Sequence, residues 1–279
     1  MINRVCISIN NNCNLRCKYC HFHEKENIIN QSDMDIYNIL DNIKKYIYQY
    51  NIEMFKIGFV GNGEPLLNFK ELKQYIEYLS EEINNCSVSV YTITNGLLLT
   101  KEMLLFFKKY NVNVGFSIDG ISTIHNKWRC NTFDKTIDKI NLFKEVFGYY
   151  PSMNCTVGTD VINHADETIE FFKKFNNRIT FSRMIGKYGI ERKEFDGFIE
   201  YASKELNVRT GGYDCTMYGG KCAAGINNYF YANGKVYLCG NCIDLKYSLP
   251  SITPLDEINF DINSFDRNKC FKEESNPCE

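Results

Sequence analysis

The chain has 279 residues, a net charge of −2 at pH 7, 44% hydrophobic and 24% charged residues. This is ordinary globular composition, sufficient for one large domain or for a medium domain with a small one. The charge balance gives no reason to expect nucleic acid as a partner, and no apolar run approaches the length of a membrane span. The N-terminal stretch MINRVCISINNNC lacks the features of a signal peptide, so we expect a cytoplasmic protein with no membrane partner.

Six short apolar runs predict β-strands, at residues 5–10, 54–61, 87–94, 112–119, 152–158 and 178–183. Apolar residues at helical spacing predict helices after the first, second and fourth runs, and a last helix from Glu191 to about Leu206. Ser32 is the expected N-cap of the first helix. Alternating strands and helices imply right-handed crossovers and a parallel sheet. We therefore expect an α/β fold, a partial (β/α)6 TIM-like barrel, over residues 1–206.

The character of the sequence changes after residue 206. Residues 207–279 contain six of the cysteines and no long helical pattern. The stretch YFYANGKVYLC predicts a β-hairpin that turns at Asn233 and Gly234, because an Asn-Gly pair favours the tight turn between antiparallel strands. We expect a small cysteine-rich second domain there.

The cysteine content is high, with 13 cysteines against 4 histidines. Thiols stay reduced in the cytoplasm, so metal binding or catalysis explains them better than disulfides do. Three of them, Cys13, Cys17 and Cys20, follow the first predicted strand. A zinc site normally shows paired C-x2-C units or histidine partners that complete four ligands. A [4Fe–4S] cluster usually takes four cysteines, so three would leave one iron open to bind a small molecule. The alternative is three buried thiols on one loop.

The run Cys13-Asn-Leu-Arg-Cys17-Lys-Tyr19-Cys20 resembles the signature of the radical SAM (S-adenosylmethionine) enzymes, CxxxCxΦC with an aromatic residue at Φ. The resemblance implies that the open iron of the cluster binds the amino and carboxylate groups of SAM. Reductive cleavage of SAM would then give methionine and a 5′-deoxyadenosyl radical, which abstracts a hydrogen atom from the substrate. By the same resemblance, Tyr19 would lie against the adenine.

Short polar motifs end the second, third and fourth predicted strands, where active sites of parallel β/α folds gather. Each motif alone is a common turn former. A dinucleotide-binding loop is disfavoured for GNGEP because Leu66 stands where that loop needs its third glycine. The resemblance implies that the GNGEP backbone holds the SAM amino group, and that later residues contact its ribose and carboxylate. The expected SAM-binding residues are Gly61, Gly63 and Glu64 in GNGEP, Asn95 in TNG, Ser117 in SIDG, and Arg129.

The later cysteines surround the predicted hairpin. The spacing from Cys222 to Cys239 resembles the opening of the SPASM and twitch extensions, which hold auxiliary iron–sulfur clusters. The resemblance implies one auxiliary [4Fe–4S] cluster, although the cysteines after Cys239 depart from the full SPASM spacing. A zinc site that uses Cys239 and Cys242 is the competing interpretation. The expected ligands of the auxiliary cluster are Cys215, Cys222 and Cys239, with Cys242, Cys270 or Cys278 as the fourth.

Two further cysteines and two histidines each have two interpretations. Cys6 and Cys155 lie in strand patterns and are expected to be small buried residues. The alternative is that one of them faces the barrel interior and donates a hydrogen atom. His21 and His23 flank the cysteine motif, where they either tune the cluster or serve ordinary surface roles.

The resemblances imply a radical SAM enzyme that modifies a ribosomally made peptide or a protein side chain by crosslinking, thioether formation or epimerisation. TNG, SIDG and HNKWR are most similar to sulfatase-maturing enzymes and peptide maturases. However, Gly240 follows Cys239 where sulfatase maturases have an aspartate base, which disfavours formylglycine formation. The alternatives are a radical SAM dehydrogenase of a sugar or aminocyclitol, and an iron–sulfur electron carrier or sensor.

Two kinds of partner are implied. One is an electron donor such as flavodoxin or ferredoxin. The other is the peptide or protein substrate. Few residues precede Cys13, so we expect no separate N-terminal module for its recognition. The barrel mouth, residues 207–279 or a partner protein would bind it instead, in part by β-augmentation.

Overall fold

A computed structural model describes residues 1–20, 35–83, 86–211, 225–240 and 248–260, without the side chains of 209–211. None of the described helices is both long and apolar enough to cross a membrane. The elements in chain order are β1 (Arg4–Ile7), α1 (Ile36–Gln49), β2 (Met54–Phe59), η2 (Pro65–Asn68), α2 (Phe69–Glu82), β3 (Ser87–Thr94), α3 (Lys101–Lys109), β4 (Asn113–Ser117), α4 (Ser122–Trp128), α5 (Phe133–Phe147), β5 (Ser152–Val157), α6 (Thr159–Asn163), α7 (Ala165–Lys173), β6 (Ile179–Arg183), η3 (Gly186–Tyr188), α8 (Arg192–Ala202), β7 (Val208–Gly211), β8 (Asn228–Ala232), β9 (Lys235–Tyr237) and β10 (Ser248–Pro250).

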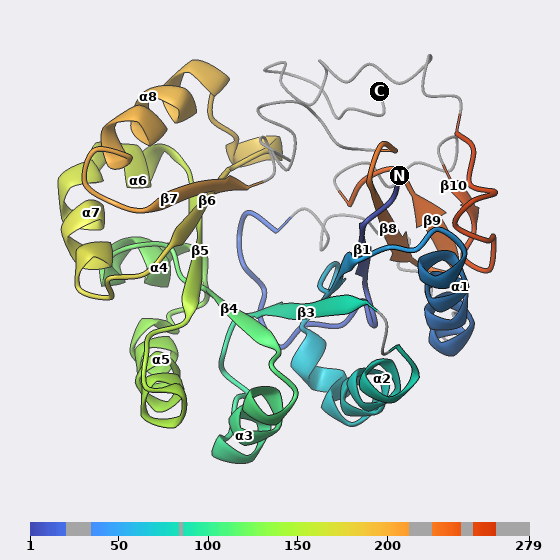
Figure 1. Ribbon diagram of the computed structural model, residues 1–279. Coiled ribbons are helices and arrows are strands. Elements are labelled where there is room, and N and C mark those ends of the chain that lie inside the picture. The colour runs from blue at the N-terminus through green and yellow to red at the C-terminus, as the bar shows by residue number, and fades with distance from the viewer. Residues whose placement is uncertain (21–34, 84–85, 212–224, 241–247, 261–279) are drawn as a thin grey trace.

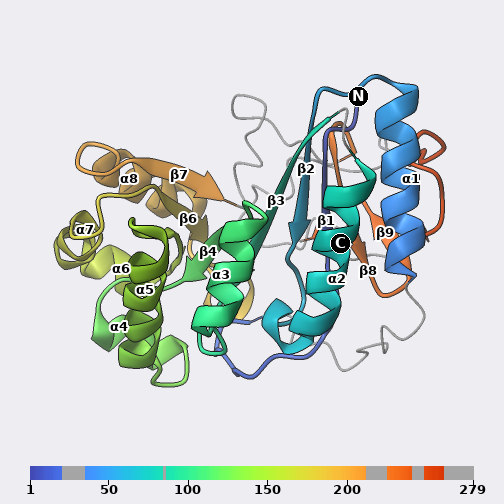
Figure 2. The same ribbon diagram turned by 60° about the horizontal axis from the view of Figure 1, so that its bottom comes forward.

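The described strands form one sheet in the order β10-β9-β8-β1-β2-β3-β4-β5-β6-β7. Strands β1 to β7 pair in parallel, as expected when helices connect successive strands. Figure 1 shows the sheet as an open arc with the connecting helices on its convex side, and Figure 2 shows α1 and α2 side by side along the strands. The predicted α/β fold with a partial TIM-like barrel is confirmed, and the sheet is not closed.

The convex face of the sheet carries the hydrophobic core. Buried phenylalanines of β2, β4 and β6 contact aromatic rings of α2, α5 and α7, in the pairs Phe59–Tyr75, Phe116–Phe143 and Phe181–Phe172. Side chains alternate between the two faces of a strand. The strand residues next to these phenylalanines, such as Ser117, therefore face the concave side.

The six strands expected from the sequence are confirmed as β1 to β6. The last predicted helix is α8, whose first turn is closed by a capping box between Glu191 and Glu194. The N-cap of α1 is Asp35, which accepts a hydrogen bond from the Asn38 backbone N at 3.0 Å. The expectation of Ser32 as this cap is corrected, because the helix begins at Ile36; Ser32 itself lies outside the described residues.

The predicted hairpin is also confirmed. Strands β8 and β9 pair antiparallel around Asn233 and Gly234, whose φ angles of 53° and 70° are those of a tight hairpin turn. Strand β8 pairs in parallel with β1, and the unpredicted strand β7 pairs in parallel with β6. Both ends of the barrel sheet are thus extended by residues after 206. The division into domains at residues 206 and 207 remains a prediction.

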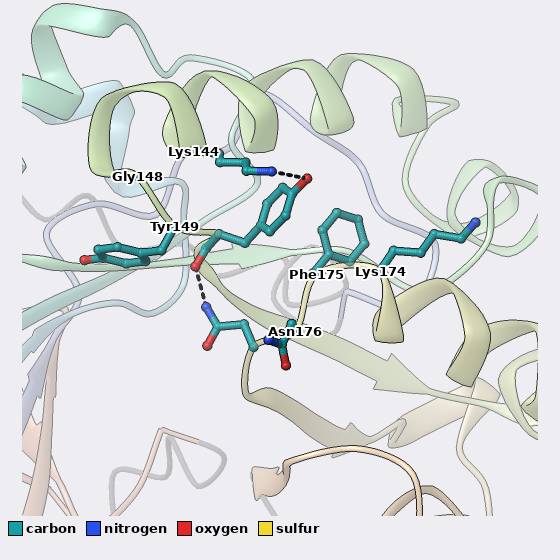
Figure 3. A pocket seen from close by; sticks show the side chains of 8 residues that line it. Lys144, Gly148, Tyr149, Lys174, Phe175 and Asn176 are labelled. Atoms are coloured by element: carbon teal, nitrogen blue, oxygen red, sulfur yellow. Dashed lines mark hydrogen bonds between the residues drawn. The ribbon is translucent and has the colours of Figure 1, made fainter.

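A pocket lies at the end of the sheet where β5 and β6 begin (Figure 3). Tyr150 is one of the residues that line it. Lys144 Nζ donates to the Tyr150 hydroxyl at 3.1 Å, and Asn177 Nδ2 donates to its backbone oxygen. Because this pocket is at the amino ends of the strands, it is separate from the carboxyl ends, where the predicted site residues lie.

Candidate active site

The cysteine loop, residues 11–20, follows the carboxyl end of β1. Cys13, Cys17 and Cys20 are free, partly exposed thiols. The Cys20 backbone N donates to Cys17 O at 3.0 Å, and the Leu15 backbone N donates to Cys13 Sγ at 3.4 Å. Burial raises the pKa of Cys17 to about 12 and also raises that of Cys13, and Cys20 contributes to both increases. The loop therefore places three thiols near one another.

The donor set of this loop, three cysteine thiols, is of the kind that binds an iron–sulfur cluster. Within the described residues, no three Cys, His, Asp or Glu side chains converge as the ligands of one metal ion must. In a [4Fe–4S] cluster each thiolate binds a different iron, so neighbouring thiols need not converge on one point. Thiols are soft ligands of the kind that such clusters use, and they lose their protons when iron binds.

The GNGEP loop after β2 packs directly against the cysteine loop. The Glu64 backbone N donates to Asn12 O at 2.8 Å, and Asn10 Nδ2 donates to Glu64 O at 2.9 Å. A Cβ atom on Gly63 would lie 2.3 Å from the Asn12 backbone oxygen. Glycine at position 63 thus permits the close approach of the two loops.

Asn62 leaves one buried acceptor unsatisfied. Its side chain is 8% exposed, and its Nδ2 donates to Asn11 Oδ1 at 2.9 Å. Its Oδ1 has no hydrogen-bond donor among the described residues. Because an unsatisfied buried acceptor is costly, this oxygen calls for a donor such as an amino group. Contact of the GNGEP loop with the amino group of SAM remains a prediction.

The Glu64 side chain joins the ends of β2 and β3. It is 3% exposed and accepts hydrogen bonds from Thr94 Oγ1 at 2.5 Å, the Asn95 backbone N at 2.9 Å and the Leu66 backbone N at 3.2 Å. Burial raises the pKa of Glu64, and these three donors oppose the increase. Asn95 Nδ2 in turn donates to Asn14 Oδ1 at 2.8 Å, which connects the TNG turn to the cysteine loop. Both residues thus hold the site together, and their contacts with SAM remain predictions.

Asp119 of the SIDG motif is the central residue of the site. It is 1% exposed and accepts hydrogen bonds from Tyr19 Oη at 2.6 Å, Arg129 Nε at 2.7 Å and the Thr156 backbone N at 2.9 Å. The sequence assigned Ser117 of this motif to the site and gave Asp119 no role. The sequence did contain a signal for this role. Asp119 stands at a strand end ten residues before Arg129, and a buried acid and a buried base require each other as partners.

Arg129 lies beside Tyr19 of the cysteine loop. Its guanidinium carbon is 5.4 Å from the centre of the Tyr19 ring. Burial alone would lower the pKa of Arg129, but Asp119, Tyr19 and Cys17 raise it well above its usual value, so the side chain is charged. Its terminal amino groups make no hydrogen bond to any described residue, since only Nε contacts Asp119. A carboxylate is the natural partner of such a buried guanidinium.

The other predicted site residues have fewer contacts in the structure or lie outside the described residues. Ser117 is next to Asn154 in the sheet register and has no hydrogen bond from its hydroxyl to any described residue. Cys239 is buried directly after the hairpin. The remaining predicted auxiliary ligands and the two flanking histidines lie outside the described residues, namely Cys215, Cys222, Cys242, Cys270, Cys278, His21 and His23.

The two cysteines considered as hydrogen donors lie on opposite faces of the sheet. Cys155 is 1% exposed and is next to Phe181 in the register, on the face covered by helices. The interpretation of Cys155 as a thiol facing the barrel interior is therefore wrong. Cys6 alternates with the buried Ile7 and lies on the concave face, with its Sγ 3.2 Å from the Tyr91 hydroxyl. Cys6 as a hydrogen donor remains a prediction.

His125 supports the loop that carries Asp119 and Arg129. Its Nδ1 accepts a hydrogen bond from the Asp119 backbone N at 3.3 Å, and its Nε2 lies 3.2 Å from Thr132 Oγ1, which donates to Arg129 O at 2.7 Å. These partners require a neutral ring with its proton on Nε2, because Nδ1 must accept. Burial lowers the pKa of His125 to about 4, with a further decrease from Arg129 and an opposing effect from Asp119.

We expect this histidine to make the fold sensitive to acid. Its pKa is depressed from 6.5 to about 4 in the folded state, so between these values the unfolded chain binds more protons. Its contribution is fully present above about pH 6.5 and is lost as the pH falls toward 4, by about 3 kcal/mol. Urea unfolding at a series of pH values measures this, with His125→Gln as the non-titrating control. Equal pH dependence of the two proteins would contradict the assignment.

Residues 7–175 match the family model of the radical SAM superfamily. This match covers more than half of the chain and includes the cysteine loop and the carboxyl ends of β1 to β4. The chain belongs to the radical SAM superfamily.

Several relatives within this superfamily are maturation enzymes. The chain is 27% identical over 207 residues to the cysteine-type anaerobic sulfatase-maturating enzyme of Clostridium novyi, covering 67% of this chain and 55% of that protein. It is 32% identical over 149 residues to the serine-type enzyme of Bacteroides thetaiotaomicron, covering 48% of this chain and 34% of that protein. The chain thus spans about half the length of these relatives, or less.

The fold has a solved counterpart. The structure of anSMEcpe with bound AdoMet and a Cp18Cys peptide superposes with a TM-score of 0.74 at 22% identity, covering 98% of this chain and 84% of that one. At this identity the similarity establishes the fold, in agreement with the open parallel sheet described above.

Proposed function

We propose that this protein is an enzyme that cleaves SAM reductively and modifies a peptide or protein side chain. The observation that carries the proposal is the meeting of the cysteine loop with the Asp119–Arg129 pair at the carboxyl edge of the sheet. The positive charge of the buried Arg129 guanidinium acts on the Cys17 thiol and lowers its pKa, against the larger effect of burial. The three thiols that would bind a cluster therefore lie next to the cation that would bind a carboxylate.

Each part of the site has a proposed task. Cys13, Cys17 and Cys20 would hold a [4Fe–4S] cluster with one open iron, which together with SAM supplies a 5′-deoxyadenosyl radical. Arg129 would bind the SAM carboxylate, because its terminal amino groups have no hydrogen bond within the described residues. Asp119 would fix the orientation of that guanidinium, and Asn62 Oδ1 would accept a hydrogen bond from the SAM amino group.

The remaining contacts are proposed from the family resemblance. Tyr19 would lie against the adenine, with its hydroxyl held by Asp119. Asn95 and Ser117 would contact the ribose, and Gly61, Gly63 and Glu64 shape the loop that receives the amino group. Glu64 does so through its hydrogen bonds to the TNG turn.

A peptide or protein substrate is supported by the relatives, whose names describe maturation of sulfatases, which are proteins. The concave face of the sheet, which includes Cys6 and Ser117, is the proposed side of substrate entry. Cysteines 215, 222 and 239, with a fourth from the C-terminal segment, would bind one auxiliary [4Fe–4S] cluster. Crosslinking, thioether formation and epimerisation are the proposed outcomes.

The test is release of 5′-deoxyadenosine from SAM by the anaerobically reconstituted protein with dithionite. We expect slow release without substrate and faster release with an unmodified peptide that carries Cys, Ser, Trp or Lys. Mass spectrometry of the peptide measures its modification. Absence of any 5′-deoxyadenosine from a protein that holds its iron would refute the SAM activity. Stimulation by sugars and by no peptide would favour the dehydrogenase alternative.

A further inference from the structure

A row of three aromatic rings connects the cysteine loop with the protein surface. The ring centres of Tyr19 and Trp128 are 5.9 Å apart, and those of Trp128 and Tyr188 are 5.1 Å apart. Trp128 is 8% exposed, whereas Tyr188, in the short helix η3, is 38% exposed. Since Tyr19 is next to Cys20 in the chain, packed side chains lead from the solvent to the proposed cluster.

Cationic side chains surround the outer end of this row. Lys127 Nζ is 5.2 Å from the centre of the Trp128 ring, and Lys187 Nζ is 5.3 Å from the centre of the Tyr188 ring. The Lys18 backbone N donates to Trp128 O at 3.0 Å, which places the exposed Lys18 beside them. The whole chain has a net charge of −2, so this gathering of positive charge is local.

One acid lies among these cations. Asp160 accepts from Lys127 Nζ at 2.6 Å and from Trp128 Nε1 at 2.8 Å. Within the part of the chain that the structure describes, Lys18 and Lys187 form no ion pair. Lys18, Lys127 and Lys187 together thus carry more positive charge than Asp160 balances.

Exposed apolar side chains accompany these charges in and next to the short helix η3. Ile185 and Tyr188 are among the large hydrophobic residues that stay exposed, at 37% and 38%. Exposed aromatic and aliphatic side chains beside charged ones are usual in protein interfaces. We call Lys18, Lys127, Ile185, Lys187 and Tyr188 around Trp128 the Trp128 surface. Charge complementarity selects a partner with an acidic face.

We propose that the Trp128 surface docks an acidic one-electron carrier protein of the flavodoxin or ferredoxin kind. In each transfer the carrier loses one electron and the cluster of the cysteine loop gains it, with no atom transferred. The inference rests on the proposed function, because SAM cleavage consumes one electron. It adds the place where that electron enters.

The buried Trp128 lies between the proposed docking surface and the cysteine loop. Its indole ring lies between the exposed Tyr188 and Tyr19 and is itself buried. An electron needs no opening, because it tunnels through closely packed groups. The Trp128 surface thus serves electron transfer, while the concave face of the sheet is the proposed side of substrate entry.

The experiment compares two reductants of the reconstituted protein by the loss of visible cluster absorbance. One is a reduced bacterial flavodoxin and the other is dithionite. With Lys127→Glu and Lys187→Glu combined, we expect reduction by flavodoxin at low salt to be about tenfold slower, because electrostatic steering is reversed. Added salt should slow the wild type and bring the two rates together. Reduction by dithionite should be unchanged.

The matched control combines Lys45→Glu and Lys174→Glu, an equal charge change on α1 and at the end of α7. Figure 3 shows Lys174 beside the pocket at the amino ends of the strands. The control should keep the wild-type rate with flavodoxin. Tyr188→Ala, which removes an exposed aromatic ring without changing charge, should also slow reduction by flavodoxin and leave reduction by dithionite unchanged. Equal rates for wild type and the Lys127/Lys187 variant, or an equal loss in the control, would overturn the proposal.

A failure of the proposed function gives a different experimental result from a failure of the docking proposal. If the protein binds no reducible cluster, dithionite bleaches nothing in the wild type. Docking is then judged on the apoprotein by carbodiimide cross-linking to flavodoxin, which joins lysine amines to carboxylates in contact. Cross-links at Lys127 or Lys187 are expected, and cross-links confined to other lysines would overturn the docking surface.

Discussion

Replacement of Asp119 by Asn is expected to lower the free energy of unfolding by about 3–5 kcal/mol. The reason is the buried guanidinium of Arg129, whose Nε donates to Asp119 Oδ2 at 2.7 Å, with the side chains 11% and 1% exposed. Removal of one partner leaves the other charge buried and uncompensated. The same change weakens the fixed orientation of Tyr19, which donates to the same oxygen. Urea unfolding of the two proteins at neutral pH measures the difference.

A double-mutant cycle separates the charge pair from simple loss of packing. Arg129→Met and the combined variant Asp119→Asn with Arg129→Met complete it. We expect the double variant to be more stable than the sum of the single effects implies, because it buries no unpaired charge. Asp160→Asn is the matched control, since it removes an acid paired with the exposed Lys127 and should cost about 0–1 kcal/mol for that pair. A loss at Asp119 no larger than at Asp160 would contradict this role.

The strands were predictable because each combines an apolar run with flanking turn residues. β7 lacks the apolar run, since its four residues Val-Arg-Thr-Gly contain one apolar side chain. Helix α3 was missed although Leu104 and Phe107 are buried at helical spacing. The pairing of β8 with β1 joins residues more than two hundred positions apart, and no local pattern specifies such a partner.

The site was predictable in its location and less so in its roles. Strand ends marked by GNGEP, TNG and SIDG lie at one edge of the sheet, as parallel pairing requires. The sequence did not indicate which polar atoms already have partners within the chain. Glu64 uses both carboxylate oxygens to join β2 and β3, and Asp119, without an assigned role, binds Tyr19 and Arg129. These pairings arise from segments brought together by the fold.

The second large effect is expected from iron content. Anaerobic reconstitution should give about eight irons per chain if two [4Fe–4S] clusters form. Replacement of Cys13, Cys17 and Cys20 by Ala should leave about half of that iron and abolish release of 5′-deoxyadenosine. The cause is loss of all the chain's ligands to the cluster that activates SAM. Iron analysis and chromatography of the reaction mixture measure both results.

Two further variants test whether the loss of iron is specific to the Cys13, Cys17 and Cys20 cluster. Replacement of Cys222 and Cys239 by Ala should also remove about half of the iron, but some substrate-free SAM cleavage should remain, because the radical forms at the first cluster. Replacement of Cys6, Cys86 and Cys155 by Ala is the matched control and should keep all the iron, because these cysteines lie in or beside strands and outside both proposed ligand sets. Full iron in the Cys13/Cys17/Cys20 variant would reject the first cluster. Full iron and full product formation in the Cys222/Cys239 variant would reject the auxiliary cluster while leaving the first intact, since the two ligand sets share no residue.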